Sequence, residues 1–283
     1  MKKLLLATAA LALATGTASA ADLPRRAAPP PVFTPVPVFT WTGFYAGLET
    51  TYVWNDRSRA TTTSPSAVLD AGVADGSQRT RNVALRSYDG LANIGGGGGY
   101  NYQFTPGSGI VVGAAVNIDW VDQHRNSFST STAGNVSRYG QGLEYLGTVT
   151  GRVGYAWDRF LVYGTGGLAF GSVDNSADFY GPGVGAALRY TGGERSFRTG
   201  FAYGGGVEYA IPEDSFLNYL SVGKYLGIKS NAVTLKAEYL HYDLGSHSIF
   251  AANQPGFTAP GYRVRFRDEG NLVRVGFNYK FGG

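Results

Sequence analysis

Arginine is the side chain whose type and placement say most about possible chemistry in this chain of 283 residues. Four long stretches between candidate strands contain arginine but no lysine. Their arginines are Arg57, Arg59, Arg79, Arg81, Arg86, Arg125, Arg138, Arg189, Arg195, Arg198, Arg263, Arg265 and Arg267. A guanidinium stays charged and binds phosphate through two parallel N–H donors, whereas lysine is a point charge. The pattern favours recognition of anionic groups, with an ordinary solvated loop surface as the alternative.

The chain offers little material for covalent or metal chemistry. It has no cysteine, which excludes disulfides, thiolate metal ligands and a cysteine nucleophile. Its histidines are His124, His241 and His247. The pairs His247-Ser248 and Asp268-Glu269 are raw material for a hydrolase set and no more. We therefore expect no enzymatic activity, no cofactor and no metal site.

These side chains must be positioned by strands, because eight stretches alternate between apolar and polar residues. The candidate strands lie near residues 43–54, 91–104, 110–121, 143–156, 160–173, 200–210, 232–244 and 270–281. In the last of them, Val273, Val275 and Phe277 lie on one face, and Arg274 and Lys280 on the other. All six prolines beyond residue 40 fall between the strands, where a missing N–H does not interrupt a ladder.

The faces opposite the apolar ones carry four acidic and four basic side chains. They are Glu49, Asp119, Arg152, Glu208, Lys236, Glu238, Arg274 and Lys280. If these faces point into one lumen, the charges can pair there, which is how a narrow barrel can bury ions. In a soluble β-sandwich the same charges would form the solvated surface instead. Eight apolar faces with charge confined to the opposite faces favour lipid on the outside.

Connector lengths and aromatic positions also favour a transmembrane barrel. Long and short connectors mostly alternate, as expected for long extracellular loops and short periplasmic turns. Aromatic residues gather near strand ends, where they would form girdles at the two membrane surfaces. No apolar stretch of about 18 residues follows the N-terminal segment, so we expect no transmembrane helix. We predict an all-β protein with one eight-stranded antiparallel barrel over residues 43–281, as a monomer.

The N-terminal region predicts export. A basic start at Lys2-Lys3, an apolar run over residues 4–14 and an A-x-A site at residues 18–20 predict a signal peptide over residues 1–20. Residues 21–42 contain six prolines and are predicted to form an extended periplasmic segment. One connector, residues 211–231, is too long and too apolar for a periplasmic turn. A packed insertion is favoured there over a partner-docking segment.

Several motifs resemble one known family. They are ADLPRRAAPPP at residues 21–31, WTGFYAG at 41–47, VEYA at 207–210, LKAEYLHYDLG at 235–245 and VRVGFNYKF at 273–281. They resemble the RopB-type outer-membrane immunogenic proteins of alphaproteobacteria, which are small OmpA-like or opacity-like barrels of the "porin family". The resemblance implies an outer-membrane location and handling by periplasmic chaperones and the β-barrel assembly machinery. It also implies that the last strand is the assembly signal, through Val275, Phe277, Tyr279 and Phe281, although this chain continues to Gly282-Gly283.

An outer-membrane location suggests what the arginines bind. The outer leaflet presents lipopolysaccharide phosphates and carboxylates, so Arg86, Arg198, Arg265 and Arg267, at the loop bases, are our candidate lipopolysaccharide-binding residues. We expect a structural and envelope-surface role rather than diffusion of large solutes, because about eight strands leave a lumen just filled by side chains. We expect no nucleic-acid partner. The alternatives are a narrow porin-like channel, or haemin capture by His124 and His247, since relatives of the family it resembles include haemin binders.

Overall fold

The computed structural model describes residues 38–55, 58–86, 89–212 and 232–281, which belong to one compact unit. The predicted signal peptide, most of the Pro-rich segment, nearly all of the 211–231 connector and Gly282-Gly283 lie outside these residues. Those assignments stay predictions. In the part of the chain that is described, no helix is both long enough and apolar enough to span a bilayer.

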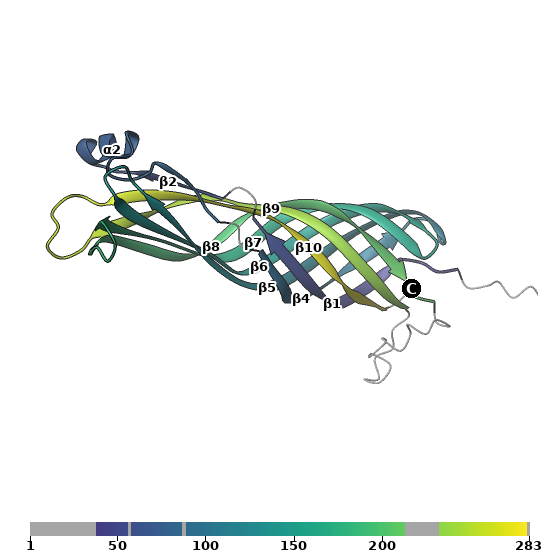
Figure 1. The fold of residues 1–283 in the computed structure, drawn as a ribbon. Coiled ribbons are helices and arrows are strands. Elements are labelled where there is room, and N and C mark those ends of the chain that lie inside the picture. The colour runs from purple at the N-terminus through teal and green to yellow at the C-terminus, as the bar shows by residue number, and fades with distance from the viewer. Residues whose placement is uncertain (1–37, 56–57, 87–88, 213–231, 282–283) are drawn as a thin grey trace, which may run out of the picture. The chain divides into compact units, whose positions relative to one another are not determined.

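Eight antiparallel strands form a closed ring (Figure 1). They are β1 (Gly43–Trp54), β4 (Asp89–Gln103), β5 (Ser108–Thr130), β6 (Asn135–Trp157), β7 (Phe160–Pro182), β8 (Leu188–Ala210), β9 (Ala232–Asn253) and β10 (Tyr262–Phe281). Each strand pairs with the next one along the chain, and β1 pairs with both β4 and β10, which closes the ring. The predicted eight-stranded antiparallel barrel is confirmed.

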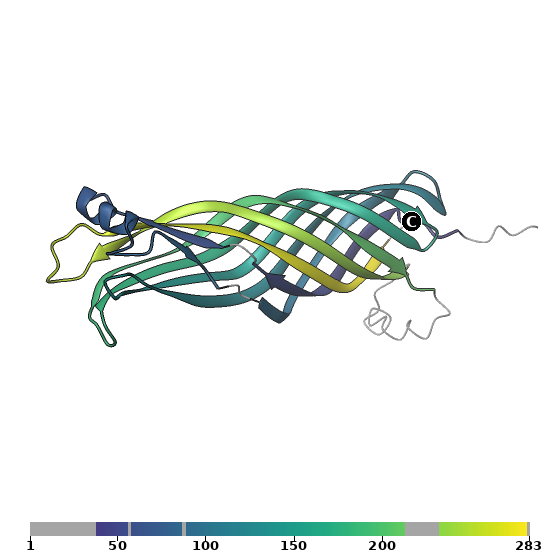
Figure 2. The same ribbon diagram turned by 45° about the horizontal axis from the view of Figure 1, so that its top comes forward.

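A short hairpin and one helix complete the outer end, far from the C-terminus (Figures 1 and 2). They are β2 (Arg59–Thr63), α2 (Ala67–Ala74) and β3 (Asn82–Ala84). Trp54 of β1 faces Asn271 of β10, and further out Ala60 of β2 faces Phe266, so β2 takes the place of β1 beside β10 with a slip of one residue. β3 pairs with β2 in turn. The first hairpin of the barrel is therefore interrupted but extends outward like the others.

Strands β5 to β10 continue outward well beyond the predicted ranges. Most residues expected to form long loops belong to strands, and the tips between them are residues 131–134, 183–187 and 254–261. Strand β10 shows the reason, because its odd-numbered side chains face outward along its whole length. These are apolar at Val273 and Val275 but cationic at Arg263 and Arg265. The alternation with a period of two continues while the surroundings of the outward face change from lipid to water. A strand end predicted from the apolar face alone therefore comes too early.

A belt of exposed apolar side chains surrounds the half of the barrel that is nearer the C-terminus. On β5 it runs from Ile110, 52% exposed, to Trp120, 64% exposed. Ten residues of strand cover about 33 Å, and at a tilt of about 40° this corresponds to about 25 Å along the membrane normal. That height matches the apolar band of outer-membrane barrels.

The interior is filled by alternating apolar and polar layers, and strand β6 crosses all of them. From the inner end outward its inward side chains include Ala156, Arg152, Leu146, Gln141 and Tyr139, all buried. Ala156, Leu146 and Tyr139 each belong to a separate apolar cluster. Arg152 and Gln141 lie in the polar layers between them. The lumen is therefore occupied by side chains at every level that β6 passes.

Among the described residues, β3 has no ladder partner on β5, and a seam without ladder bonds lies between β8 and β9. These strands pair over residues 201–210 and 234–243, and again where Tyr190 and Thr191 meet Asn253 and Ala252. Between those points, residues 192–200 and 244–251 are fully described and have no ladder partner across the seam. On their other sides, β8 pairs with β7 and β9 with β10.

We expect this seam to show in amide hydrogen exchange. Peptides covering residues 192–200 should exchange faster than peptides covering residues 171–179 of β7, because unpaired amides open without breaking a ladder bond. The β7 segment is a matched control, since it lies directly opposite β8 and is paired on both sides. Mass spectrometry of the full chain in micelles measures both, and equal protection would contradict the open seam.

Candidate functional site

A buried arginine lies at the centre of the lumen at membrane depth. The Arg274 side chain is 0% exposed, and its Nη2 donates to Asp119 Oδ2 at 2.5 Å. Its Nη1 donates to Glu238 Oε2 at 3.2 Å, and its Nε lies 3.4 Å from Glu49 Oε1. Lys236 Nζ contacts the other oxygen of Glu49 at 2.5 Å. Four strands, β1, β5, β9 and β10, thus contribute to one ionic cluster.

A second ion pair adjoins this cluster. Arg152 Nη1 donates to Glu208 Oε1 at 2.7 Å, and its Nε donates to Asn101 Oδ1 at 2.7 Å. The Tyr163 hydroxyl donates to Glu238 Oε1 at 3.1 Å and connects the pair to the cluster. The structure thus brings together seven of the eight charges predicted for the lumen. The eighth, Lys280, is also buried but lies nearer the inner end, 5.9 Å from the Phe39 ring centroid.

Uncharged partners of this network escaped the sequence reasoning. Thr51 Oγ1 donates to Asp119 Oδ1 at 2.5 Å, and the Tyr45 ring lies 4.6 Å from the Arg152 guanidinium. Asn101 and Tyr163 belong to the same group. All four occupy inward positions of their strands, so the period of two could have identified them once the lumen face was assigned.

A second polar layer lies further out and contains His247. Its Nδ1 is 3.1 Å from Asp268 Oδ2, and its Nε2 is 3.1 Å from Asn175 Nδ2. Gln141 Nε2 donates to Asp268 Oδ1 at 2.8 Å. The His247 side chain is 4% exposed, so its ring is enclosed rather than presented to a surface ligand such as haemin. The neighbouring Ser248 side chain is exposed on the opposite face, so no His–Ser–acid set forms here.

The other haemin candidate, His124, has a different environment. It lies on β5, its side chain is half exposed, and its Nε2 is 3.6 Å from Asp122 Oδ1. Strands β5 and β9 are not neighbours in the ring, so the structure does not unite His124 and His247 in one site.

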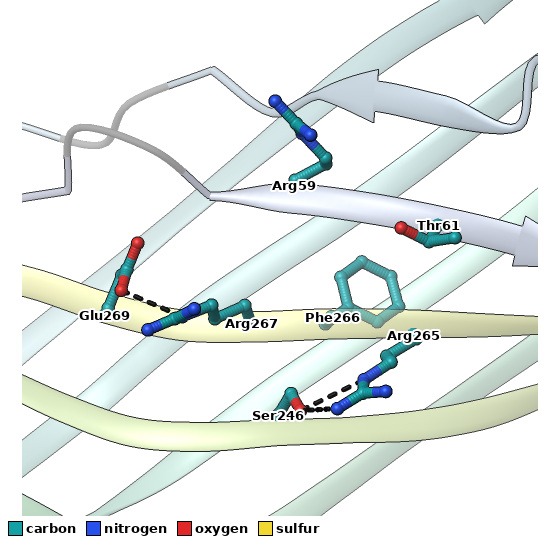
Figure 3. Close-up of a pocket in the computed structure, with 7 residues that line it drawn as sticks. All are labelled: Arg59, Thr61, Ser246, Arg265, Phe266, Arg267 and Glu269. Atoms are coloured by element: carbon teal, nitrogen blue, oxygen red, sulfur yellow. Dashed lines mark hydrogen bonds and ion pairs between the residues drawn. The ribbon is translucent and has the colours of Figure 1, made fainter.

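An arginine-lined cavity opens on the outer face of β2, β9 and β10 (Figure 3). Its volume is about 430 Å³. It is lined by Arg59, Thr61, Ser246, Arg265, Phe266, Arg267 and Glu269. Of the four predicted lipopolysaccharide-binding residues, Arg265 and Arg267 meet here. Arg198 lies on β8 beside Glu194, and Arg86 follows β3, where its backbone N–H donates to Ser127 Oγ.

The three arginines of this cavity differ in their partners. Arg267 is held by Asp243 Oδ2 and Glu269 Oε2, each at 2.8 Å. Arg265 donates to Ser246 Oγ from Nε at 3.0 Å and from Nη2 at 2.5 Å, as Figure 3 shows. Within the described residues, neither Arg265 nor Arg59 is paired with a carboxylate. The cavity therefore has two uncompensated positive charges, and Arg59 is the member of the set that the sequence reasoning missed.

Arg79 serves the fold rather than this cavity. It is almost fully buried, and its Nη1 donates to the carbonyl oxygens of Val136 at 3.0 Å and Tyr180 at 2.9 Å. Its guanidinium lies 5.0 Å from the Phe179 ring centroid. Burial lowers the pKa of the Arg79 side chain below its usual range. These contacts attach the segment between α2 and β3 to β6 and β7.

A closed ring with an apolar outer belt and a charged interior defines a transmembrane β-barrel. The chain belongs to the family described as "outer membrane protein beta-barrel domain", whose model matches residues 7–281. It is 30% identical over 282 residues to the 31 kDa outer-membrane immunogenic protein of Brucella melitensis, covering 99% of this chain and 100% of that one. The predicted family and the outer-membrane location are confirmed.

Two further similarities are more distant. The 22 kDa outer membrane protein of Rhizobium leguminosarum bv. viciae is 29% identical over 183 residues, which cover 65% of this chain and 63% of that one. The crystal structure of the outer membrane protein OprG from Pseudomonas aeruginosa aligns with a TM-score of 0.44 and 12% identity, covering 86% of this chain and 97% of that one.

Removal of Arg274 should destabilise the barrel strongly. An Arg274→Met variant leaves Asp119, Glu49 and Glu238 buried without their shared cation, and breaking a buried pair in this way costs about 3–5 kcal/mol. The free energy of unfolding can be measured by urea titration in lipid vesicles with tryptophan fluorescence. Arg195→Met is the matched control, because that side chain is 61% exposed in its ion pair with Glu144 and its loss should cost at most about 1 kcal/mol. Equal losses for the two variants would contradict the role assigned to Arg274.

Proposed function

We propose that this outer-membrane barrel is a closed, monomeric element of the envelope that binds lipopolysaccharide at its outer rim. The observation that carries the proposal is the cavity with two uncompensated arginines, Arg59 and Arg265, on the outward face of β2 and β10. Guanidinium groups without a carboxylate partner are available to bind phosphate bidentately.

The height of the cavity supports this proposal. Trp54 faces Asn271 of β10, and its ring lies 6.2 Å from that of Tyr239, so these aromatics mark the outer edge of the apolar belt. Arg267 lies four residues further along β10. That is about 13 Å of strand, or about 10 Å along the membrane normal at a tilt of about 40°. The cavity therefore lies at the level where the charged groups of outer-leaflet lipids begin.

The filled lumen supports a structural role rather than a channel. Three apolar clusters and two polar layers occupy the interior of the described barrel. The middle cluster includes Leu146, Leu240 and Leu272, which come from β6, β9 and β10 and are all fully buried. A hydrated ion would have to displace these side chains to pass.

We also propose that β10 is the strand read by the assembly machinery, after delivery by periplasmic chaperones. Its outward apolar positions near the end of the chain include Val275, which is 51% exposed, and alternate with buried polar ones. The strand pairs with β1, so its docking completes the ring.

Planar-bilayer recordings should detect no stable unit conductance from the purified full chain. The apolar clusters leave no continuous polar path in the described interior, so added voltage should yield only baseline current. Steps of a reproducible size that become more frequent as protein is added would contradict the closed-lumen proposal and would favour the channel alternative.

Loss of the free arginines should reduce lipopolysaccharide retention. In an Arg59→Gln, Arg265→Gln variant we expect co-purified lipopolysaccharide to fall at least about tenfold, because charge-assisted hydrogen bonds contribute about 1.5–3 kcal/mol each. Phosphate assay of the purified barrel measures retention. Arg195→Gln removes an exposed arginine that is already paired with Glu144 and should have little effect. An Arg86→Gln, Arg198→Gln variant tests the other two predicted residues, and unchanged retention in all variants would refute the proposal.

A further inference from the structure

A second cavity lies on the lipid-facing wall, nearer the inner end of the barrel than the arginine-lined cavity. Its volume is about 490 Å³, and it is formed by β7, β8, β9 and β10. It is lined by Val162, Tyr163, Gly205, Gly206, Val207, Ala237, Glu238, Tyr239 and Val273. Val207, Ala237 and Tyr239 are exposed on this wall. Because they belong to the belt, the hollow opens to hydrocarbon.

The outward position of β8 at the centre of the hollow is a glycine, Gly205, which has no side chain to fill the wall. A Cβ atom placed on Gly205 would lie 2.8 Å from the backbone oxygen of Tyr163. Real Cβ atoms essentially never show contacts this short, so a larger residue at this position would force the backbone of β7 or β8 to shift. Val207, the next outward residue along β8, lines the hollow.

Strands β9 and β10 connect the hollow to the arginine-lined cavity. From Val273 in the hollow to Arg267 in the cavity is six residues of β10, or about 20 Å of strand. Polar side chains lie between them: the Tyr239 hydroxyl donates to Asn271 Oδ1 at 2.7 Å, and His241 Nδ1 lies 3.1 Å from the same oxygen. From the membrane outward, this face of the barrel presents an apolar hollow, hydrogen-bonding groups and then guanidinium groups.

We infer that this face is a preformed binding site for one phosphorylated glycolipid of the outer leaflet. A phosphate lies between Arg59 and Arg265, the sugar contacts the Tyr239–Asn271 level, and one acyl chain occupies the hollow beside Ala237. Arg267 is a positioning residue, because Asp243 and Glu269 already hold its guanidinium. The inference rests on the proposed lipopolysaccharide binding and adds that an acyl chain is recognised together with the phosphate.

The test uses the full chain in detergent micelles, titrated with three probes and followed by native mass spectrometry. The probes are bisphosphorylated lipid A, the same lipid A without phosphates, and inorganic phosphate. We expect lipid A to bind at least about tenfold more tightly than its dephosphorylated form, as charge-assisted contacts predict. Inorganic phosphate should bind weakly, since it lacks the acyl contacts.

Two variants test the acyl-chain part and the phosphate part of this binding site separately. Ala237→Trp fills the hollow and should weaken lipid A binding about tenfold, which corresponds to the loss of about ten van der Waals contacts between the acyl chain and the wall. The matched control is Ala114→Trp, since Ala114 is an exposed outward alanine on β5, away from the hollow. Arg59→Gln with Arg265→Gln should abolish the preference for the phosphorylated lipid. Heat-modifiable migration in gels establishes that each variant is folded.

The outcomes separate this inference from the function on which it rests. If the arginine variant binds lipid A more weakly but Ala237→Trp binds it like Ala114→Trp, lipopolysaccharide binding stands and recognition of the acyl chain is refuted. If neither variant changes lipid A binding, both are refuted. If inorganic phosphate binds as tightly as lipid A, the cavity is a free-phosphate site and the glycolipid inference fails.

Discussion

In hydrocarbon an unpaired backbone amide or carbonyl has no water to bind, and each one costs several kcal/mol. A sheet in the membrane must therefore have no edge. Here β1 meets that constraint by pairing with β10 from Phe44 opposite Phe281 to Trp54 opposite Asn271. Closure after eight strands makes the interior narrow, and so every inward side chain has to share space with those across the lumen. The layered interior and the outward-facing chemistry both follow from this closure.

The narrow interior explains why its charges are so tightly coupled. Ions cannot be buried singly, because desolvation exceeds any single weak contact, so Arg274 is surrounded by Asp119, Glu49 and Glu238 at once. Apolar clusters close the lumen on both sides of that network. The proposal of a closed lumen rests on this use of the interior. The chemistry available to ligands is consequently on the outer face, where lipid gives way to water.

The outward face of the strands shows which parts of the fold could be predicted from the local sequence pattern. Eight strands, the lumen charges and the family could be predicted from the sequence, because alternation of period two is visible within each stretch. The outward halves of β5 to β10 were missed, because there the polarity of the two faces inverts: Arg263 and Arg265 point outward while Val264 and Phe266 pack inside. The same inversion hid His247, whose inward position on β9 makes it a buried partner of Asp268 rather than a loop ligand.

By itself, the sequence determined which residues face lipid and which face the lumen, since strand periodicity is a local property of the chain. Only the tertiary structure decided which of them meet. Arg274 and Asp119 are 155 residues apart in sequence and become partners because a ring of eight strands brings β5 and β10 across one narrow lumen. Arg59 reaches the cavity of Arg265 because β2 takes the place of β1 beside β10. Such contacts between side chains distant in sequence depend on ring closure and strand register, and neither can be read from any single stretch of sequence.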